Sequence, residues 1–344
     1  MATTKTILVT GASGFIAKHI VLQLLNKGHS VVGSIRNLSR ADEVTTAVKP
    51  HLDDTENLDD RLRFVALDLT HDQGWDAAMT GIDAVMHTAS PFPMSQPKDE
   101  MELIGPAVDG VNRALNAAHK AGIKRVILTS SVAAIAYGHG ANIKAVYDHS
   151  DWTNFNGPGL SPYVKSKTLA EAAAWKFVRE TAPEMQLTAV NPGLVLGAPL
   201  DDHYGTSLQL VERLLSGKDP MLPKFGFTIV DVQDVAKIHV AALDAPETIG
   251  QRLIGVSGFM WFKDVAQTIK AANPERKTVT REAPNFLIRI FALFDPAIKS
   301  IVAELGKETQ VSAAPTTDLL AMEFISPSTS VLTAADYVLK SGKV

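Results

Sequence analysis

A glycine-containing turn links the first apolar run of this chain to its first helical pattern. Residues 6–10 form the apolar run, Gly11-Ala-Ser-Gly14-Phe-Ile-Ala17 follows at once, and Ile20 and Leu24 then recur at helical spacing. In such a strand, turn and helix, the first glycine permits a tight turn, the second lets the backbone approach a pyrophosphate, and the small Ala17 permits close helix packing. The N–H groups at the helix start attract phosphate. We therefore predict a dinucleotide-binding unit, with a turn that binds no ligand as the alternative; its expected contacts are Gly11, Ser13, Gly14, Phe15 and Ile16.

Short apolar runs alternate with helical patterns through the first half of the chain. Helices are expected over residues 100–121 and 163–180, and strands are expected over residues 6–10, 30–35, 62–67, 84–87, 126–130 and 187–191. Strands separated by helices form βαβ units with a parallel sheet and right-handed crossovers. The sequence therefore predicts an α/β fold, namely a Rossmann doubly wound parallel sheet.

The alternation becomes less regular after Asn191-Pro-Gly193, where prolines are more frequent. We expect residues 1–192 to form the Rossmann domain and residues 193–344 to form a smaller, mixed α/β region that binds the substrate. Residues 227–244 are helix-patterned after Asp231, so this segment is expected to return to the first domain. The apolar stretch 286–302 is broken by charged residues and a proline, and it reads as one or two half-buried helices rather than a membrane span.

Composition excludes several kinds of function. The 344 residues include no cysteine, which excludes disulfides, thiolate nucleophiles and cysteine zinc sites. The formal net charge of −4 gives no general attraction to nucleic acid or anionic lipid. The chain also lacks a zinc-binding His-Glu-x-x-His helix and a Gly-x-Ser-x-Gly nucleophile turn. With no apolar leader at the start, we expect a cytoplasmic protein without a metal, nucleic-acid or membrane partner.

The end of the second expected strand indicates which dinucleotide is bound. The residues there are Gly33-Ser-Ile-Arg36-Asn37, and no acidic residue occurs before Asp42. NAD enzymes usually place an acid there to bind the ribose hydroxyls, whereas an arginine can pair with a 2′-phosphate. We therefore predict NADP (NADPH when reduced), with Arg36 at the 2′-phosphate; a surface arginine without this role is the alternative. Asp68 ends the third strand, where it could bond the adenine amino group or cap the following turn.

A tyrosine and a lysine one helical turn apart follow the fifth strand. In Ser161-Pro-Tyr163-Val-Lys-Ser-Lys167 the serine is a typical helix cap and the proline a typical first residue, so the two side chains share a face. A free tyrosine has a pKa near ~10, too high for efficient proton transfer at neutral pH, and a nearby ammonium lowers it. The hydroxyls of Thr129-Ser-Ser131 end a strand at the same edge of the sheet, where one can hold a substrate oxygen.

Five motifs, taken together and in order, resemble those of the extended short-chain dehydrogenases/reductases. Within that group they are most similar to the dihydroflavonol 4-reductase-like branch, which includes cinnamoyl-CoA reductases and methylglyoxal/aldehyde reductases. The resemblance implies an NADPH-dependent carbonyl (ketone or aldehyde) reductase that gives an alcohol and can run in reverse. The motifs are Thr10-Gly-Ala-Ser-Gly-Phe-Ile-Ala17, His87-Thr-Ala-Ser-Pro91, Lys124-Arg-Val-Ile-Leu-Thr-Ser-Ser131, Tyr163-Val-Lys-Ser-Lys167 and Asn191-Pro-Gly193.

The resemblance also implies roles for individual residues. Ser131, rather than Ser130, would hold the substrate oxygen, Tyr163 would be the general acid, and Lys167 would lower its pKa and bind the ribose. Where relatives often carry an asparagine that helps to hold a proton-relay water, this chain has Asp109. The implied cofactor contacts are Arg36, Asp68, Leu69, Thr88, Ala89, Ser90, Tyr163, Lys167, Asn191, Pro192 and Gly193, and the candidate substrate contacts are Phe92, Val132 and Tyr204.

Two other functions agree with part of the pattern. A nucleotide-sugar epimerase or dehydratase would share the fold and the Tyr163 and Lys167 pair, but it would more often hold NAD, against which Arg36 argues. A non-catalytic NADP sensor commonly lacks that pair. His87 ends a buried strand and is interpreted as a core histidine. A small aldehyde, ketone or ketoester is the first expectation for the substrate, and the resemblance is to proteins that are monomers or homodimers.

Overall fold

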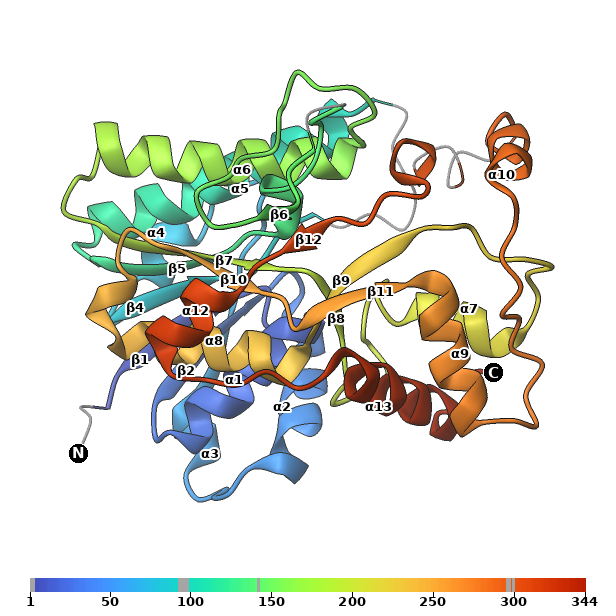
Figure 1. Ribbon diagram of the computed structural model, residues 1–344. Coiled ribbons are helices and arrows are strands. Elements are labelled where there is room, and N and C mark those ends of the chain that lie inside the picture. Colours follow the sequence, from blue (N-terminus) through green and yellow to red (C-terminus); the bar gives the residue numbers. More distant parts are fainter. Residues whose placement is uncertain (1–3, 92–98, 141–142, 295–297, 299–300) are drawn as a thin grey trace.

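The computed structural model describes residues 4–91, 99–140, 143–294, 298 and 301–344 (Figure 1). Within these residues, seven parallel strands form a central sheet in the order β3-β2-β1-β4-β5-β7-β10. This order is that of a Rossmann fold, so the predicted fold class is confirmed. The strands are β1 (Thr6–Thr10), β2 (Ser30–Ile35), β3 (Leu62–Ala66), β4 (Ala84–His87), β5 (Arg125–Thr129), β7 (Gln186–Pro192) and β10 (Arg252–Gly255).

The central strands are apolar because helices cover both faces of the sheet. Ile7, Leu8 and Val9 of β1 are all fully buried, so neither face of this strand reaches solvent. Cores lie on the two sides of the sheet: one includes α1 (Phe15–Asn26) and α8 (Val232–Asp244), and the other includes α5 (Met101–Lys120) and α6 (Pro162–Glu180).

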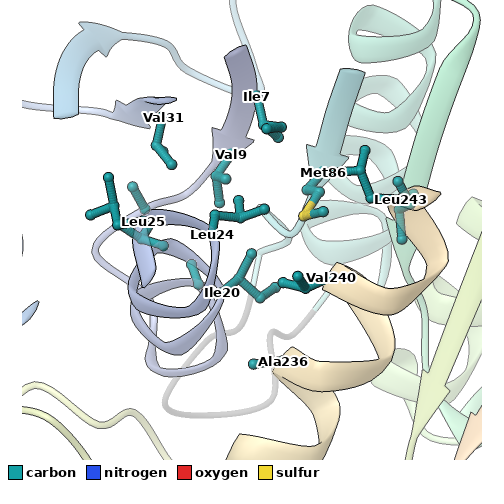
Figure 2. Close-up of a cluster of buried hydrophobic side chains, with 14 of the residues drawn as sticks. Ile7, Val9, Ile20, Leu24, Leu25, Val31, Met86, Ala236, Val240 and Leu243 are labelled. Carbon is teal, nitrogen blue, oxygen red and sulfur yellow. The ribbon is translucent and has the colours of Figure 1, made fainter. Parts of the chain in front are cut away.

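Figure 2 shows the first of these cores. Ile20 and Leu24 of α1 and Val240 of α8 point toward Ile7 and Met86 of the sheet. The spacing of Ile20 and Leu24 is one helical turn, which is the periodicity that predicted this helix. Shorter helical elements of this half of the chain include α2 (Ala41–Val48), α3 (Leu58–Arg61), α4 (Trp75–Ala78) and the 3-10 turn η3 (Val132–Ala134).

The C-terminal region has its own sheets and core. β8 (Leu194–Leu196), β9 (Gly226–Asp231) and β11 (Gly258–Trp261) form one sheet, and β6 (Val146–Tyr147) pairs with β12 (Gln310–Val311). A separate apolar cluster joins the first sheet to the helices beside it. The helices of this region are α7 (Gln209–Ser216), α9 (Phe262–Ala272), α10 (Asn285–Phe291), α12 (Ala314–Leu320) and α13 (Pro327–Lys340).

The chain returns to the central sheet after leaving it. Residues 227–231 lie in β9 of the small sheet, so the return begins at α8, which packs against α1, and continues through β10, which pairs with β7. Residues 227–244 were expected to make this return, and α8 lies within that segment and ends at its last residue. The division of the chain at residues 192 and 193 stays a prediction.

The apolar stretch 286–302 contains α10. Ile288 is buried and Phe286 and Ile290 are exposed, as expected for a helix that is half buried. In the part of the chain that the structure describes, no helix combines the length and the apolar character needed to span a membrane.

Candidate active site

The turn between β1 and α1 has the geometry that a bound pyrophosphate requires. Gly11 has a φ of +67°, and a Cβ at this position would lie 3.0 Å from the Cα of Ala89. Only glycine suits both conditions. Gly14 is the N-cap of α1 and carries no side chain to occupy the free N–H groups of the first turn. The helix start is therefore open to an anion, and the residues present suit a dinucleotide.

A single cavity of about 550 Å³ joins this turn to the predicted reacting residues. Parallel strands end at one edge of the sheet, and the cavity lies at that edge beside the small C-terminal sheet. Most of the predicted contacts line it: Gly11, Gly14, Phe15, Ile16, Thr88, Ser90, Ser131, Val132, Tyr163, Lys167, Pro192, Gly193 and Tyr204. The predicted contacts Ser13, Arg36, Asp68, Leu69, Ala89 and Asn191 do not line it, and Phe92 lies outside the described residues.

The start of α6 positions the tyrosine and the lysine. The Ser161 hydroxyl accepts a hydrogen bond from the backbone N–H of Val164 at 3.3 Å, which is the predicted helix cap. Tyr163 and Lys167 both reach the cavity, because they are one turn apart on the same face. The neighbouring Lys165 points elsewhere and pairs with Glu100 at 2.6 Å. The helix therefore presents one lysine, and not the other, to the tyrosine.

Burial dominates the electrostatics of this pair. Burial raises the pKa of Tyr163, and a hydrogen bond with Ser131 partly opposes that shift. Burial also lowers the pKa of Lys167 to about 8, and the charge of Glu171 opposes it. The sequence led us to expect a Tyr163 pKa lowered by Lys167, whereas burial raises the Tyr163 pKa in this structure.

The two serines after β5 have different partners. The Ser130 hydroxyl donates its one proton to the buried Glu171 carboxylate at 2.5 Å. The Ser131 hydroxyl bonds Tyr163 and accepts from the backbone N–H of Ala133 at 3.1 Å. Ser131 is therefore the serine that faces the tyrosine, which supports its selection over Ser130.

The end of β4 is tethered to β1 behind the cavity. The Thr10 hydroxyl accepts from the backbone N–H groups of Thr88 and Ala89, each at 3.1 Å, and contacts Nδ1 of His87 at 2.9 Å. His87 is 2% exposed, and burial lowers its pKa to about 3. The interpretation of His87 as a core histidine is confirmed by this burial, and its Nε2 has no hydrogen-bond partner among the described residues.

The expected adenine end of the cofactor site lies at the ends of β2 and β3. Arg36 is exposed, whereas its neighbour Arg40 pairs with Glu43 at 2.7 Å. Asp68 accepts hydrogen bonds from the backbone N–H and the hydroxyl of Thr70 at 2.8 and 2.7 Å, and these bonds lower the pKa of Asp68. Asp68 thus caps its turn, one of the two roles considered for it, while its contact with adenine stays a prediction.

Three further positions considered from the sequence have different surroundings in the structure. Asn191 is fully buried, and its amide donates to the Ser131 carbonyl and to Glu171, so it supports the cavity wall from behind. Asp109 is exposed on α5 and is not a lining residue, so nothing in the geometry favours a proton relay through it. Tyr204 lines the cavity, and its hydroxyl bonds Glu212.

Sequence reasoning missed Glu171, Arg252 and Glu304. Glu171 lies on α6 one turn beyond Lys167 and is fully buried, and Arg252 on β10 pairs with it at 2.5 Å. The only available signal for Glu171 was its spacing from Lys167, which is shared by many exposed glutamates. Glu304 lines the cavity from the C-terminal region, where no periodicity indicated it.

Comparison with known proteins agrees with this geometry. A sequence profile described as the NAD dependent epimerase/dehydratase family matches residues 7–255, and the chain belongs to this family. Cinnamoyl-CoA reductase 1 of Arabidopsis thaliana is 37% identical over 255 residues, which are 74% of this chain and 71% of that protein. The NADPH-dependent methylglyoxal reductase GRE2 of Saccharomyces cerevisiae is 36% identical over 79% of this chain and 84% of its own length. The extended short-chain dehydrogenase/reductase resemblance is confirmed.

Two solved reductase structures also superpose on this chain. The yeast methylglyoxal/isovaleraldehyde reductase Gre2 complexed with NADPH superposes with a TM-score of 0.81 at 29% identity, covering 98% of this chain and 100% of that one. The Candida albicans Gre2 in complex with NADPH has a TM-score of 0.80 at 25% identity, covering 98% of this chain and 99% of its own. The likeness therefore includes the C-terminal region as well as the Rossmann sheet.

Proposed function

We propose that this protein is an NADPH-dependent oxidoreductase that reduces a ketone or aldehyde to an alcohol and catalyses the reverse reaction. The observation that carries the proposal is the cavity that contains the start of α1 together with Ser131, Tyr163 and Lys167. The relatives whose names specify NADPH and a carbonyl substrate support both the cofactor and the reaction class.

The residues present fit the cofactor. The turn from Gly11 to Gly14 would hold the pyrophosphate, Arg36 the 2′-phosphate and Lys167 the nicotinamide ribose. The wall made by Pro192 and Gly193 would lie at the nicotinamide end. When bound, NADPH supplies the hydride to the carbonyl carbon.

Side chains of the protein donate the proton and stabilise the negative charge that develops on the carbonyl oxygen. The Tyr163 hydroxyl donates its proton to the carbonyl oxygen, and the Ser131 hydroxyl donates a hydrogen bond to the same oxygen. Burial raises the pKa of Tyr163, so the phenol is protonated at neutral pH, as a general acid for reduction must be. The Lys167 ammonium stabilises the phenolate that remains after the transfer.

The lining of the cavity favours an uncharged carbonyl compound. Phe225, Phe227 and Ile301 are among its apolar lining residues. Among the described residues, its only charged side chains are Lys167 and Glu304. A carboxylate on the substrate would meet the like charge of Glu304, which disfavours 2-oxo acids. A small aldehyde, ketone or ketoester suits this surface.

A panel of carbonyl compounds, assayed by the loss of NADPH absorbance, tests the proposal. We expect turnover of neutral aldehydes, ketones or ketoesters, with NADPH strongly preferred over NADH. No NADPH oxidation across a broad panel would overturn it. Purified protein that releases firmly held NAD on denaturation would instead favour an epimerase.

A further inference from the structure

The carboxylate of Glu171 is the centre of a buried network behind the proposed reacting residues. Its side chain is fully buried. One oxygen accepts from the Ser130 hydroxyl at 2.5 Å and the Asn191 amide at 2.7 Å. The other accepts from the Trp175 indole at 3.1 Å and Arg252 Nε at 2.5 Å. The donors come from β7, α6, β10 and the residue that directly follows β5, so a single carboxylate joins these segments at the reactive edge of the sheet.

Two of these donors determine the position of Ser131. Ser130 precedes it directly, and Asn191 donates to the Ser131 carbonyl at 3.1 Å as well as to Glu171. The backbone on both sides of the Ser131 side chain is thus connected to Glu171. Displacement of the carboxylate would release these connections and change the distance between the Ser131 hydroxyl and Tyr163, to which it is hydrogen-bonded.

Arg252 holds the carboxylate from the other side. Besides Glu171, its guanidinium donates to the carbonyls of His149, Asp151 and Ala134, and it stacks 4.0 Å from the centre of the Trp152 ring. Ala134 belongs to η3, the turn that directly follows Ser131. The side chain is 8% exposed. Such an ion pair fixes the positions of its two side chains but adds little to the stability of the fold, because the cost of removing two charges from water roughly cancels their attraction.

We propose that Glu171, held by Arg252, is a positioning residue of the reductase: it fixes the Ser131 hydroxyl against Tyr163 and supplies the negative charge that faces Lys167. This inference rests on the function proposed above. It assigns no contact with substrate to Glu171, which acts through Ser130, Asn191 and Lys167.

The charge has a consequence for pH dependence. The titratable groups that face Lys167 are Tyr163 and Glu171, one turn away on α6 in either direction, and His87 from β4. His87 is neutral at ordinary pH, because burial lowers its pKa to about 3. Burial lowers the pKa of Lys167 to about 8, and Glu171 is the group that opposes this shift. Removing the Glu171 charge should therefore lower the pKa of Lys167 further, so that the ammonium is lost at lower pH.

The test is the Glu171→Gln variant of the full-length protein, with Asp234→Asn as the matched control. Asp234 is an equally buried carboxylate, bonded to Lys237 at 3.0 Å and to the Ile325 backbone at 2.6 Å, but it lies on α8 away from the cavity. We expect Glu171→Gln to lower kcat at least about tenfold and to move the alkaline limb of kcat to lower pH. Asp234→Asn should lower thermal stability while leaving the pH profile of kcat in place.

A second readout separates this inference from the proposed function. NADPH affinity, measured by fluorescence across pH, depends on the Lys167 ammonium whether or not a substrate is turned over. We expect the loss of affinity at high pH to begin at lower pH in Glu171→Gln. If this shift in NADPH affinity occurs but the protein reduces no carbonyl compound, the proposed function is wrong. The inferred effect of the Glu171 charge on Lys167 then still holds.

A folded Glu171→Gln protein with parental kcat and both pH profiles unchanged would overturn the positioning role. If that variant does not fold, the charge-balanced Glu171→Gln/Arg252→Met pair replaces it, since it leaves no buried charge without a partner. The double variant should show the same loss of kcat and the same alkaline shift, and parental behaviour in it would overturn the inference equally.

Discussion

The hydroxyls of Ser131 and Tyr163 are hydrogen-bonded to each other. Ser131 follows the carboxyl end of β5, and Tyr163 lies in the first turn of α6, so the pair depends on the parallel sheet to bring them together. Two neighbouring hydroxyls can bond the same carbonyl oxygen: one donates the proton, and the other donates a supporting hydrogen bond. The first prediction tests that arrangement directly.

Replacement of Tyr163 by Phe should abolish carbonyl reduction, with kcat falling at least about a hundredfold, because the proton donor is lost while the ring remains. NADPH binding should stay nearly intact. Steady-state kinetics and NADPH fluorescence titration measure the two effects. Tyr147→Phe removes a buried hydroxyl that does not line the cavity and should retain activity. Retained turnover in Tyr163→Phe would remove Tyr163 from the role of general acid.

Replacement of Arg36 by Glu should shift cofactor preference from NADPH toward NADH. The guanidinium is exposed at the end of β2, where the new carboxylate would repel a 2′-phosphate and accept from ribose hydroxyls. The ratio of kcat/KM for the two cofactors measures the shift. Arg281→Glu makes the same charge change at another exposed arginine and should leave the ratio unaltered. An unchanged ratio in Arg36→Glu would exclude the 2′-phosphate role.

Replacement of Glu304 by Gln should improve the reduction of 2-oxo acids relative to their esters. Glu304 lines the cavity and is only partly compensated by Lys307, whose ammonium lies 3.7 Å away. Removal of a like charge at short range is worth on the order of 1 kcal/mol, or about fivefold in kcat/KM. The exposed neighbour Glu308→Gln is the control. If acid and ester keep their parental ratio in Glu304→Gln, Glu304 does not determine specificity.

The free energy of unfolding should fall as the pH drops below about 6.5, the pKa of histidine in an unfolded chain. Burial lowers the pKa of His87 to about 3 and the pKa values of His19 and His239 to about 4. Between these values and about 6.5 the unfolded state binds protons that the native state does not, so each histidine contributes a loss of up to about 1.4 kcal/mol per pH unit.

Urea unfolding at a series of pH values measures that slope. His239→Gln should reduce it, because one of the three neutral histidines is removed, whereas substitution of the exposed His71 should not. Stability that stays level from about pH 7 to about pH 5 would contradict the assignment of these side chains as buried neutral groups.

The central sheet and the reacting residues were predictable for physical reasons. Strands buried on both faces must be apolar, which makes runs such as residues 6–10 visible, and ligand-binding residues gather where parallel strands end. The cap at Ser161 and the spacing of Tyr163 and Lys167 are local features, so they survive folding unchanged.

The parts that were not predicted depend on contacts between distant segments. β10 has four residues, too few for a periodic pattern, and only its pairing with β7 makes it part of the sheet. Glu171 has the sequence character of an exposed helical residue, and its burial follows from Arg252, which arrives from that unpredicted strand. Spacing revealed the Lys167 ammonium near Tyr163 but not the burial that raises the pKa of Tyr163.

The late return of the chain to the central sheet matters for its synthesis on the ribosome. β7 acquires its outer neighbour only when Arg252–Gly255 has emerged, and α1 acquires the cover of α8 only slightly earlier (Figure 2). Until then the nascent chain carries an unpaired strand edge and an uncovered apolar helix face, both of which favour aggregation. A fragment that stops at residue 192 would keep that exposed state permanently, so the nucleotide-binding half is a poor unit for separate expression.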